Sequence, residues 1–238
     1  MVIPAYDEAN RLPRYLREVV AYFDGRDEPY EVLVVDDGSR DDTAERVREL
    51  AAEHPAVALV SLPKNRGKGA AVRTGMLQAR GALRLMADAD GATSILEVKR
   101  LEAAVQGGAD LAVASRALAD PSVVVRARHH RRLSGRVFIA ITRALGVRQV
   151  MDTQCGFKLF RGGAADALFG ALRTDGFGFD VELILRAERR GYRIAEVPVN
   201  WTDQPGSKVG VLKDGPRMIA EILAARLRVA RERRGARA

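Results

Sequence analysis

Two carboxylates one residue apart are the side chains in this sequence best suited to chemistry. Asp88 and Asp90 directly follow residues 83–87, an apolar run with the pattern of a buried strand. Open α/β sheets bind ligands outside the carboxyl ends of their strands. Mg²⁺ and Mn²⁺ prefer oxygen ligands and complete their coordination with substrate phosphates. The pair therefore predicts a divalent cation shared with a nucleotide diphosphate, whereas an isolated Asp-x-Asp is more often a solvated turn.

Two further strand candidates also end in acidic residues. Asp36 and Asp37 close the run before Gly38, and residues 4–8 close the first apolar run. A carboxylate at such an end can accept hydrogen bonds from a base or from ribose hydroxyls. The alternative is that Asp37 or Ser39 only caps the following helix. Three acidic strand ends on one edge of a sheet favour nucleotide binding.

A lysine lies between two glycines at the start of a helical pattern. In residues 65–69, Lys68 is flanked by Gly67 and Gly69, and a helix start of this kind can face a phosphate. Neither the phosphate-loop spacing nor the dinucleotide fingerprint is present, which disfavours triphosphate hydrolysis and dinucleotide redox chemistry. Close packing of the backbone is an equally good reason for these glycines.

The elements that must position these residues alternate between strand and helix in the first half of the chain. We expect strands at 2–3, 31–35, 57–62, 83–87 and 111–114, with helices at 12–23 and 44–51. This order is typical of a parallel sheet covered by helices. Beyond residue 115 we expect a basic helix over about 121–145, helices at 164–172 and 180–190, a strand at 193–199 and a helix at 216–234. The economical organisation is one α/β domain over 1–212 and a basic amphipathic C-terminal helix over 213–238.

Composition limits the class of protein and its partners. The 238 residues carry 39 Lys and Arg against 31 Asp and Glu, so the net charge of +8 favours anionic partners. No apolar run approaches the roughly 20 residues of a membrane span, and no leader is evident. The single Cys155 excludes an intrachain disulfide framework. These features predict a cytoplasmic protein. The arginines of residues 126–136 are not interleaved with aromatic residues, which disfavours nucleic acid as a partner.

A series of short motifs extends along nearly the whole chain. The motifs are residues 4–8, 35–39, 65–69, 88–91, 115–116, 152–158, 179–182, 199–202 and 206–208. In order and spacing they resemble those of the dolichyl-phosphate β-glucosyltransferases, which are inverting family 2 glycosyltransferases. The resemblance implies the nucleotide-diphospho-sugar transferase (GT-A) fold, with a Rossmann-like, mostly parallel sheet flanked by helices.

The same resemblance implies where the donor binds. Ala92 stands where related dolichyl-phosphate mannose synthases usually carry a further metal-binding side chain, which favours UDP-glucose over GDP-mannose as the donor. Asp88 and Asp90 would hold Mg²⁺ or Mn²⁺. The expected donor-binding residues are Pro4, Tyr6, Glu8 and Asp37 around the nucleoside, Asp88, Ala89 and Asp90 at the ribose and pyrophosphate, and Lys68, Arg116 and Lys208 at the phosphates.

The implied reaction is attack by an acceptor phosphate oxygen on the anomeric carbon of the sugar, with UDP departing. A phosphate monoester is largely dianionic at pH 7 and needs no strong base, but cations must offset its repulsion from the diphosphate. Arg128, Arg131 and Arg132 are candidates for this clamp, unless they form a solvated helix face or contact anionic lipid. Asp152 and Gln154 are expected on the acceptor side. The expected catalytic residues are Asp88, Asp90, Asp180, Arg131 and Arg132, with Asp180 orienting the sugar or acting as a base toward an alcohol acceptor.

Several alternatives stay open at this point. Within the class these are a GDP-mannose-dependent polyprenyl-phosphate mannosyltransferase and transfer to a soluble acceptor. Outside it are a sugar-phosphate nucleotidyltransferase, which would need a glycine-rich triphosphate loop near the start, and a basic module that binds anionic surfaces. Eukaryotic members carry an N-terminal anchor that is not seen here, so we expect at most peripheral contact with the inner face of the cell membrane through the tail helix. The sequence does not specify the oligomeric state.

Overall fold

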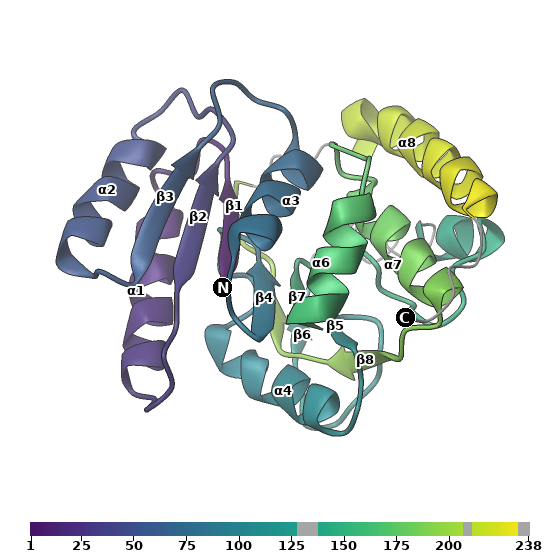
Figure 1. The fold of residues 1–238 in the computed structure, drawn as a ribbon, viewed down its shortest axis with the longest axis horizontal. Coiled ribbons are helices and arrows are strands. Elements are labelled where there is room, and N and C mark those ends of the chain that lie inside the picture. Colours follow the sequence, from purple (N-terminus) through teal and green to yellow (C-terminus); the bar gives the residue numbers. More distant parts are fainter. Residues whose placement is uncertain (128–137, 207–210, 233–238) are drawn as a thin grey trace.

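In a computed structural model of the chain, residues 1–127, 138–206 and 211–232 are described, without the side chains of 211–214. Their main feature is a seven-stranded sheet of order β3-β2-β1-β4-β7-β5-β8 with helices on both faces (Figure 1). The strands of this sheet are β1 (Val2–Ala5), β2 (Val32–Asp36), β3 (Val57–Ser61), β4 (Leu83–Ala87), β5 (Leu111–Ser115), β7 (Phe157–Arg161) and β8 (Ile194–Pro198). A small second sheet pairs β6 (Val125–Arg126) with β9 (Trp201–Thr202).

Helices connect most of these strands. These helices are α1 (Leu12–Asp24), α2 (Thr43–Glu53), α3 (Lys68–Gln78), the 3₁₀ turn η1 (Ile95–Glu97), α4 (Val98–Gln106), α6 (Gly162–Ala171), α7 (Phe179–Arg190) and α8 (Val211–Arg231). Helix α7 shows why the sequence forms them. Acidic residues lie in its first turn, arginines lie in its last turn, and Gly191 follows in the left-handed conformation. Each of these features complements the partial charges or the unpaired carbonyls of a helix end.

The direction of the strands decides which loops meet. Strands β1, β2, β3, β4, β5 and β8 run the same way, and β7 runs antiparallel between β4 and β5. The amino end of β7 therefore lies at the sheet edge where its neighbours have their carboxyl ends. The loop before β7 joins the loops after β1, β2, β4 and β5. The predicted α/β fold with a mostly parallel sheet is confirmed.

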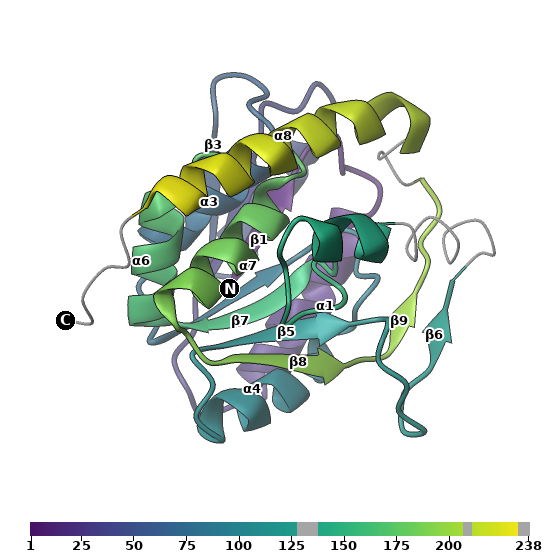
Figure 2. The ribbon, with the colours of Figure 1, turned by 90° about the vertical axis from the view of Figure 1, so that its right-hand side faces the viewer.

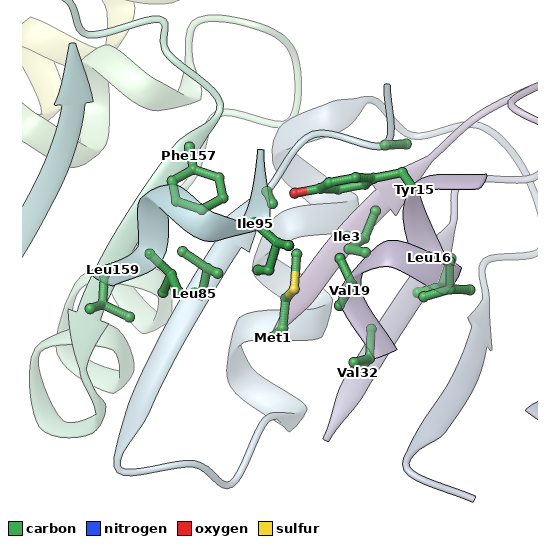
Figure 3. Close-up of a cluster of buried hydrophobic side chains, with 14 of the residues drawn as sticks. Met1, Ile3, Tyr15, Leu16, Val19, Val32, Leu85, Ile95, Phe157 and Leu159 are labelled. Atoms are coloured by element: carbon green, nitrogen blue, oxygen red, sulfur yellow. The ribbon is translucent and has the colours of Figure 1, made fainter. Parts of the chain in front are cut away.

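Alternating side chains of the strands form two layers of core. Successive residues of a strand point to opposite faces, so Ile3 and Val34 pack toward α1, α2 and α4, while Val2 and Val35 pack toward α3, α6 and α7. Both layers consist of fully buried aliphatic and aromatic side chains, which hold the strand ends in place. Figure 3 shows part of the first layer, with Met1, Ile3, Leu16, Val19 and Leu85 among the labelled residues.

Helix α8 is attached to the domain by both apolar and charged groups. It lies across α7 on the outer surface (Figure 2), and its Ile222 and Val229 belong to the second core layer. Below it, the fully buried Glu182 accepts hydrogen bonds from Arg186 at 2.7 Å and from Arg228 of α8 at 3.0 Å. Removing one partner of such a buried cluster is costly because the other charge stays desolvated. Glu182 therefore has a structural role between the two helices.

Two segments differ from the sequence prediction. The predicted helix over 121–145 is wrong at its start, since Val125–Arg126 form a strand opposite Trp201–Thr202 and helix is described only over 138–144. Pairing with a distant partner overrides the local pattern here. Helix α8 starts at Val211, five residues before the start at 216 that the pattern predicts, because the side-chain pattern does not mark where helical hydrogen bonding begins.

Candidate active site

The loops after β1 and β2 are tied together at the carboxyl edge of the sheet. The amide of Asp37 donates to the carbonyl of Ala5 at 2.8 Å, the amide of Asp7 to Ser39 Oγ at 2.9 Å, and the amide of Glu8 to Thr43 Oγ1 at 2.7 Å. Asp7 has a positive backbone φ of 50°, which residues other than glycine rarely adopt outside constrained sites. The predicted nucleoside-binding residues Pro4, Tyr6 and Glu8 lie at the end of β1 and in the loop after it, where Pro4 and Glu8 are buried and Tyr6 is partly exposed.

Asp37 holds the loop that precedes α3. Its two carboxylate oxygens accept hydrogen bonds from the amides of Arg66 and Gly67, both at 2.8 Å. Gly67 has φ 106°, and a Cβ there would overlap the carbonyl of Asp175. Burial raises the pKa of Asp37, and the two amides oppose that shift. Asp37 thus organises the Lys68 loop rather than capping α2.

The predicted metal carboxylates have cations beside them. Lys68 Nζ lies 2.6 Å from Asp88 Oδ1, and Arg11 Nη1 lies 3.9 Å from Asp90 Oδ2. Arg11 also donates from Nε to Glu8 Oε2 at 2.7 Å. Burial and the neighbouring Asp88 raise the pKa of Asp90. Burial alone would lower the pKa of Lys68, but the carboxylates of Asp88 and Asp180 raise it above the ordinary value.

This donor set fits a cation that arrives with a substrate. Nowhere in the described ranges do three or more His, Cys, Asp or Glu side chains gather as a metal cluster. The predicted protein ligands to the cation are therefore the carboxylates of Asp88 and Asp90, whose side chains are 35% and 26% exposed. Mg²⁺ and Mn²⁺ are commonly bound by one or two carboxylates together with water and substrate phosphates. The residues fit a shared metal–diphosphate site and do not form a closed structural site.

Gly156 lies directly behind Asp88. The amide of Asp88 donates to the carbonyl of Gly156 at 2.9 Å, and a Cβ at position 156 would overlap the Asp88 carboxylate. Glycine lets the Asp88 carboxylate keep this position, because a larger side chain at 156 would displace it. The loop before β7 therefore sets the position of Asp88.

Arg116 and Asp152, predicted on the donor and acceptor sides, form one ion pair. Arg116 donates to the two oxygens of Asp152 at 2.7 and 2.8 Å, and its guanidinium lies 5.3 Å from the ring centroid of the buried Trp201. Burial opposes ionisation of Asp152, but Arg116 holds its pKa below the ordinary value. In this arrangement Asp152 positions Arg116. The buried ring of Trp201 packs beside the guanidinium.

Asp180 is buried in the first turn of α7 and contacts Lys158. Lys158 has no exposed surface, and its ammonium also donates to the carbonyl of Cys155 at 2.7 Å. Burial raises the pKa of Asp180, although the ammonium groups of Lys158 and Lys68 oppose the shift. The pair links α7 to the segment that carries Gly156.

The structure brings most of the predicted residues to one edge and leaves some outside its described part. Arg128, Arg131, Arg132 and Lys208 lie outside the described residues. Sequence reasoning missed the roles of Lys158 and Arg11. Lys158 lies within the motif 152–158, which could have indicated it, whereas no pattern indicated that Arg11 would reach Asp90. The residues gathered at the edge are Pro4, Tyr6, Glu8, Asp37, Lys68, Asp88, Ala89, Asp90, Arg116, Asp152, Gln154 and Asp180.

A mostly parallel sheet with a half-buried carboxylate pair and neighbouring cations at its carboxyl edge places the protein among the open α/β proteins that bind ligands at this edge. The family model described as "Glycosyl transferase family 2" matches residues 1–169. The chain belongs to this family. The predicted family resemblance is confirmed.

Two similar relatives are both named as dolichyl-phosphate beta-glucosyltransferases. A dolichyl-phosphate beta-glucosyltransferase of Trichomonas vaginalis is 41% identical over 220 residues, which cover 88% of this chain and 65% of that protein. The dolichyl-phosphate beta-glucosyltransferase of Homo sapiens is 37% identical over 241 residues, covering 96% of this chain and 74% of its own. The chain thus spans about two thirds to three quarters of the length of these relatives.

Solved structures share the fold. Glucosyl-3-phosphoglycerate synthase from Mycobacterium tuberculosis in complex with UDP superposes with a TM-score of 0.70 at 21% identity, covering 94% of this chain and 78% of that one. The same enzyme with Mn²⁺ and UDP-glucose gives a TM-score of 0.67 at 21% identity, covering 96% and 77%. Among the described residues of this chain, no helix has the length and apolar character needed to cross a bilayer.

Proposed function

We propose that this chain transfers glucose from UDP-glucose to a polyprenyl phosphate of the dolichyl type, with inversion at the anomeric carbon. The names of the relatives in Trichomonas and human support the lipid phosphate acceptor and the glucosyl group. UDP-glucose and Mn²⁺ bound to a protein of the same fold support the donor and the cation. GDP-mannose as donor, and a soluble acceptor, are the weaker alternatives.

One observation carries the proposal. The half-buried carboxylates of Asp88 and Asp90 follow the central strand β4, with the cationic groups of Lys68 and Arg11 beside them. A site with alternating charges of this kind suits a diphosphate and a divalent ion together. A bare acidic turn would have neither the burial nor the cations.

In the proposed reaction, the end of β1 and the loop after it, with Pro4, Tyr6 and Glu8, receive the nucleoside. Asp88 and Asp90 would hold Mg²⁺ or Mn²⁺, which supplies neutralisation of the charge that develops on the departing UDP. Lys68 adds a second positive group at the phosphates. The residues thus stabilise the leaving group, which is the electrostatic part of catalysis.

The acceptor side needs orientation more than a base. A phosphate monoester is largely dianionic at pH 7, so its oxygen attacks without losing a proton. Asp152 and Gln154 would line that side, and Asp152 also holds Arg116, a candidate for the donor phosphates, in place beside the ring of Trp201. Arg128, Arg131 and Arg132 remain candidates for the phosphate clamp. Asp180, already in contact with Lys158, orients the sugar rather than accepting a proton.

The proposal includes contact between α8 and an anionic lipid surface. Ile219, Leu223 and Leu227 form an exposed apolar stripe at four-residue spacing, and Arg217 and Arg231 are exposed on the same helix. Glu221 bonds to the amide of Gly178, and Glu232 contacts Arg186, so the acidic side chains after residue 214 face the domain. An apolar stripe with basic flanks is the pattern of a helix that lies in a bilayer interface.

A transfer assay tests the proposed reaction. We expect the purified chain with Mn²⁺, UDP-glucose and polyprenyl phosphate to yield a glucosylated lipid phosphate, identified by mass spectrometry. Asp90→Asn should lower kcat at least 100-fold because it removes one metal ligand, while Asp27→Asn, an exposed control, should retain activity. Transfer from GDP-mannose alone, or full activity of Asp90→Asn, would contradict the proposal.

A further inference from the structure

Both predicted metal ligands already have a positive group of the protein beside them. The ammonium of Lys68 contacts Asp88 at 2.6 Å, and the guanidinium of Arg11 approaches Asp90 to 3.9 Å. Three carboxylates, those of Glu8, Asp88 and Asp90, thus face two cations of the chain itself. A divalent ion that reaches Asp88 without a substrate must compete with an ammonium already in contact with it.

We infer that Lys68 occupies Asp88 as an internal counterion until a metal–diphosphate arrives, and that this exchange couples metal binding to donor binding. The inference rests on the proposed function, because it takes Asp88 as a metal ligand. It adds a second role to Lys68. Besides meeting the phosphates, Lys68 weakens the binding of the metal when the donor is absent.

The backbone around Lys68 is fixed, so the exchange belongs to the side chain. Asp37 holds the amides of Arg66 and Gly67, and a Cβ at Gly69 would overlap the carbonyl of Thr174. The start of α3 therefore stays in place. The flexible four-carbon stem of a lysine can swing its ammonium between partners without moving the backbone.

Lys68 also borders a cavity that Asp88 does not line. The cavity has a volume of about 230 Å³ and is also lined by Asn65, Arg66, Gly176 and Arg217. The side chain of Lys68 is 20% exposed, so it is not locked in the core. A diphosphate bound at Asp88 would offer the ammonium new anionic oxygens, so the ammonium could leave Asp88 without losing an ionic partner.

The charges predict the sign of the coupling. Without a donor, the metal gains a carboxylate only by displacing the ammonium. With a donor, the phosphates bind both the metal and the ammonium. Metal and UDP should therefore strengthen each other, and linkage requires the effect to be equal in both directions. Replacing Lys68 by an uncharged residue should remove the competition and, with it, part of the coupling.

The test is a Mn²⁺ titration followed by the electron paramagnetic resonance signal of the free ion, with and without UDP. We expect Lys68→Met to bind Mn²⁺ without UDP about tenfold more tightly than the unaltered chain. The factor by which UDP strengthens Mn²⁺ binding should fall at least tenfold. Lys68→Arg should retain the coupling because it retains the charge. Lys64→Met, in the same loop and exposed, should behave as the unaltered chain does.

The outcomes separate this inference from the proposed function. Equal Mn²⁺ affinity of Lys68→Met and the unaltered chain without UDP would overturn the counterion role, even if glucosyl transfer is observed. Weaker binding only in the presence of UDP would also overturn it, because Lys68 would then be a phosphate ligand alone. Absence of Mn²⁺ binding in every variant, with UDP present, would overturn the metal site itself. Circular dichroism before titration verifies that each variant is folded.

Discussion

Gly156 allows the Asp88 carboxylate to lie where it does, because glycine has no side chain. Its Cα lies against the carboxylate of Asp88, and its carbonyl accepts the amide of the same residue at 2.9 Å. The position of a predicted metal ligand thus depends on the loop before a different strand. At the scale of residues, the chemistry of the site depends on contacts of this kind as much as on the acidic pair.

Gly156→Ala should therefore impair catalysis more than folding. The added methyl would displace the Asp88 carboxylate, and we expect kcat to fall at least tenfold. Overpacking should lower the free energy of unfolding by about 1–3 kcal/mol. Steady-state kinetics and denaturant unfolding measure the two effects.

Gly163→Ala is the matched control, because a Cβ there has open space and the residue lies in helix α6. It should leave kcat unchanged and should not lower stability, since alanine is the better helix former. If Gly156→Ala keeps the kcat of the unaltered chain, the loop before β7 does not set the position of Asp88.

The residues of the site could be predicted only where their chemistry is local. Asp88 and Asp90 follow an apolar run, and Lys68 lies between two glycines, so the sequence itself indicates them. The contact of Arg11 with Asp90 joins the residue just before α1 to the loop after β4, and no spacing indicates it. The pairing of Arg116 with Asp152 is also long-range, and no spacing in the sequence indicates it.

At the scale of elements, strands with local signals were predictable and pairings were not. The runs that became β2, β4 and β5 are apolar and bounded by turn residues. Strand β7 reads as a short apolar segment, but its antiparallel direction comes from its neighbours β4 and β5. That direction brings Gly156 and Asp152 to the carboxyl edge of the sheet, where the candidate site lies. The strand at Val125–Arg126 was missed because its partner lies about 75 residues away.

Helix α8 gives the prediction that belongs to this scale. Leu223 and Leu227 are 46% and 60% exposed, so Leu223→Gln together with Leu227→Gln should leave the melting temperature nearly unchanged. Binding to vesicles that contain anionic phospholipid should fall at least fivefold, because apolar burial in the interface is lost. Co-sedimentation with vesicles measures this.

Leu77→Gln, an equally exposed leucine on α3, is the control and should bind vesicles as the unaltered chain does. Equal vesicle binding by the double variant would show that α8 does not contact the bilayer. Binding that is the same for neutral and anionic vesicles would remove the role of the arginines.

At the scale of the whole molecule, six parallel strands and one inverted strand bring loops from distant parts of the sequence to a single edge. The order β3-β2-β1-β4-β7-β5-β8 puts the acidic pair of β4 at the centre of that edge. The loops after β1 and β2 lie on one side of it, and Arg116 and Asp152 lie on the other.

A crystal structure with UDP-glucose and Mn²⁺ tests the central claim most directly, because anomalous scattering locates the ion without ambiguity. We predict the ion between the diphosphate and the carboxylates of Asp88 and Asp90, with the ammonium of Lys68 moved from Asp88 to a phosphate oxygen. An ion or a nucleotide bound at another part of the surface, with the contact between Lys68 and Asp88 intact, would contradict the account.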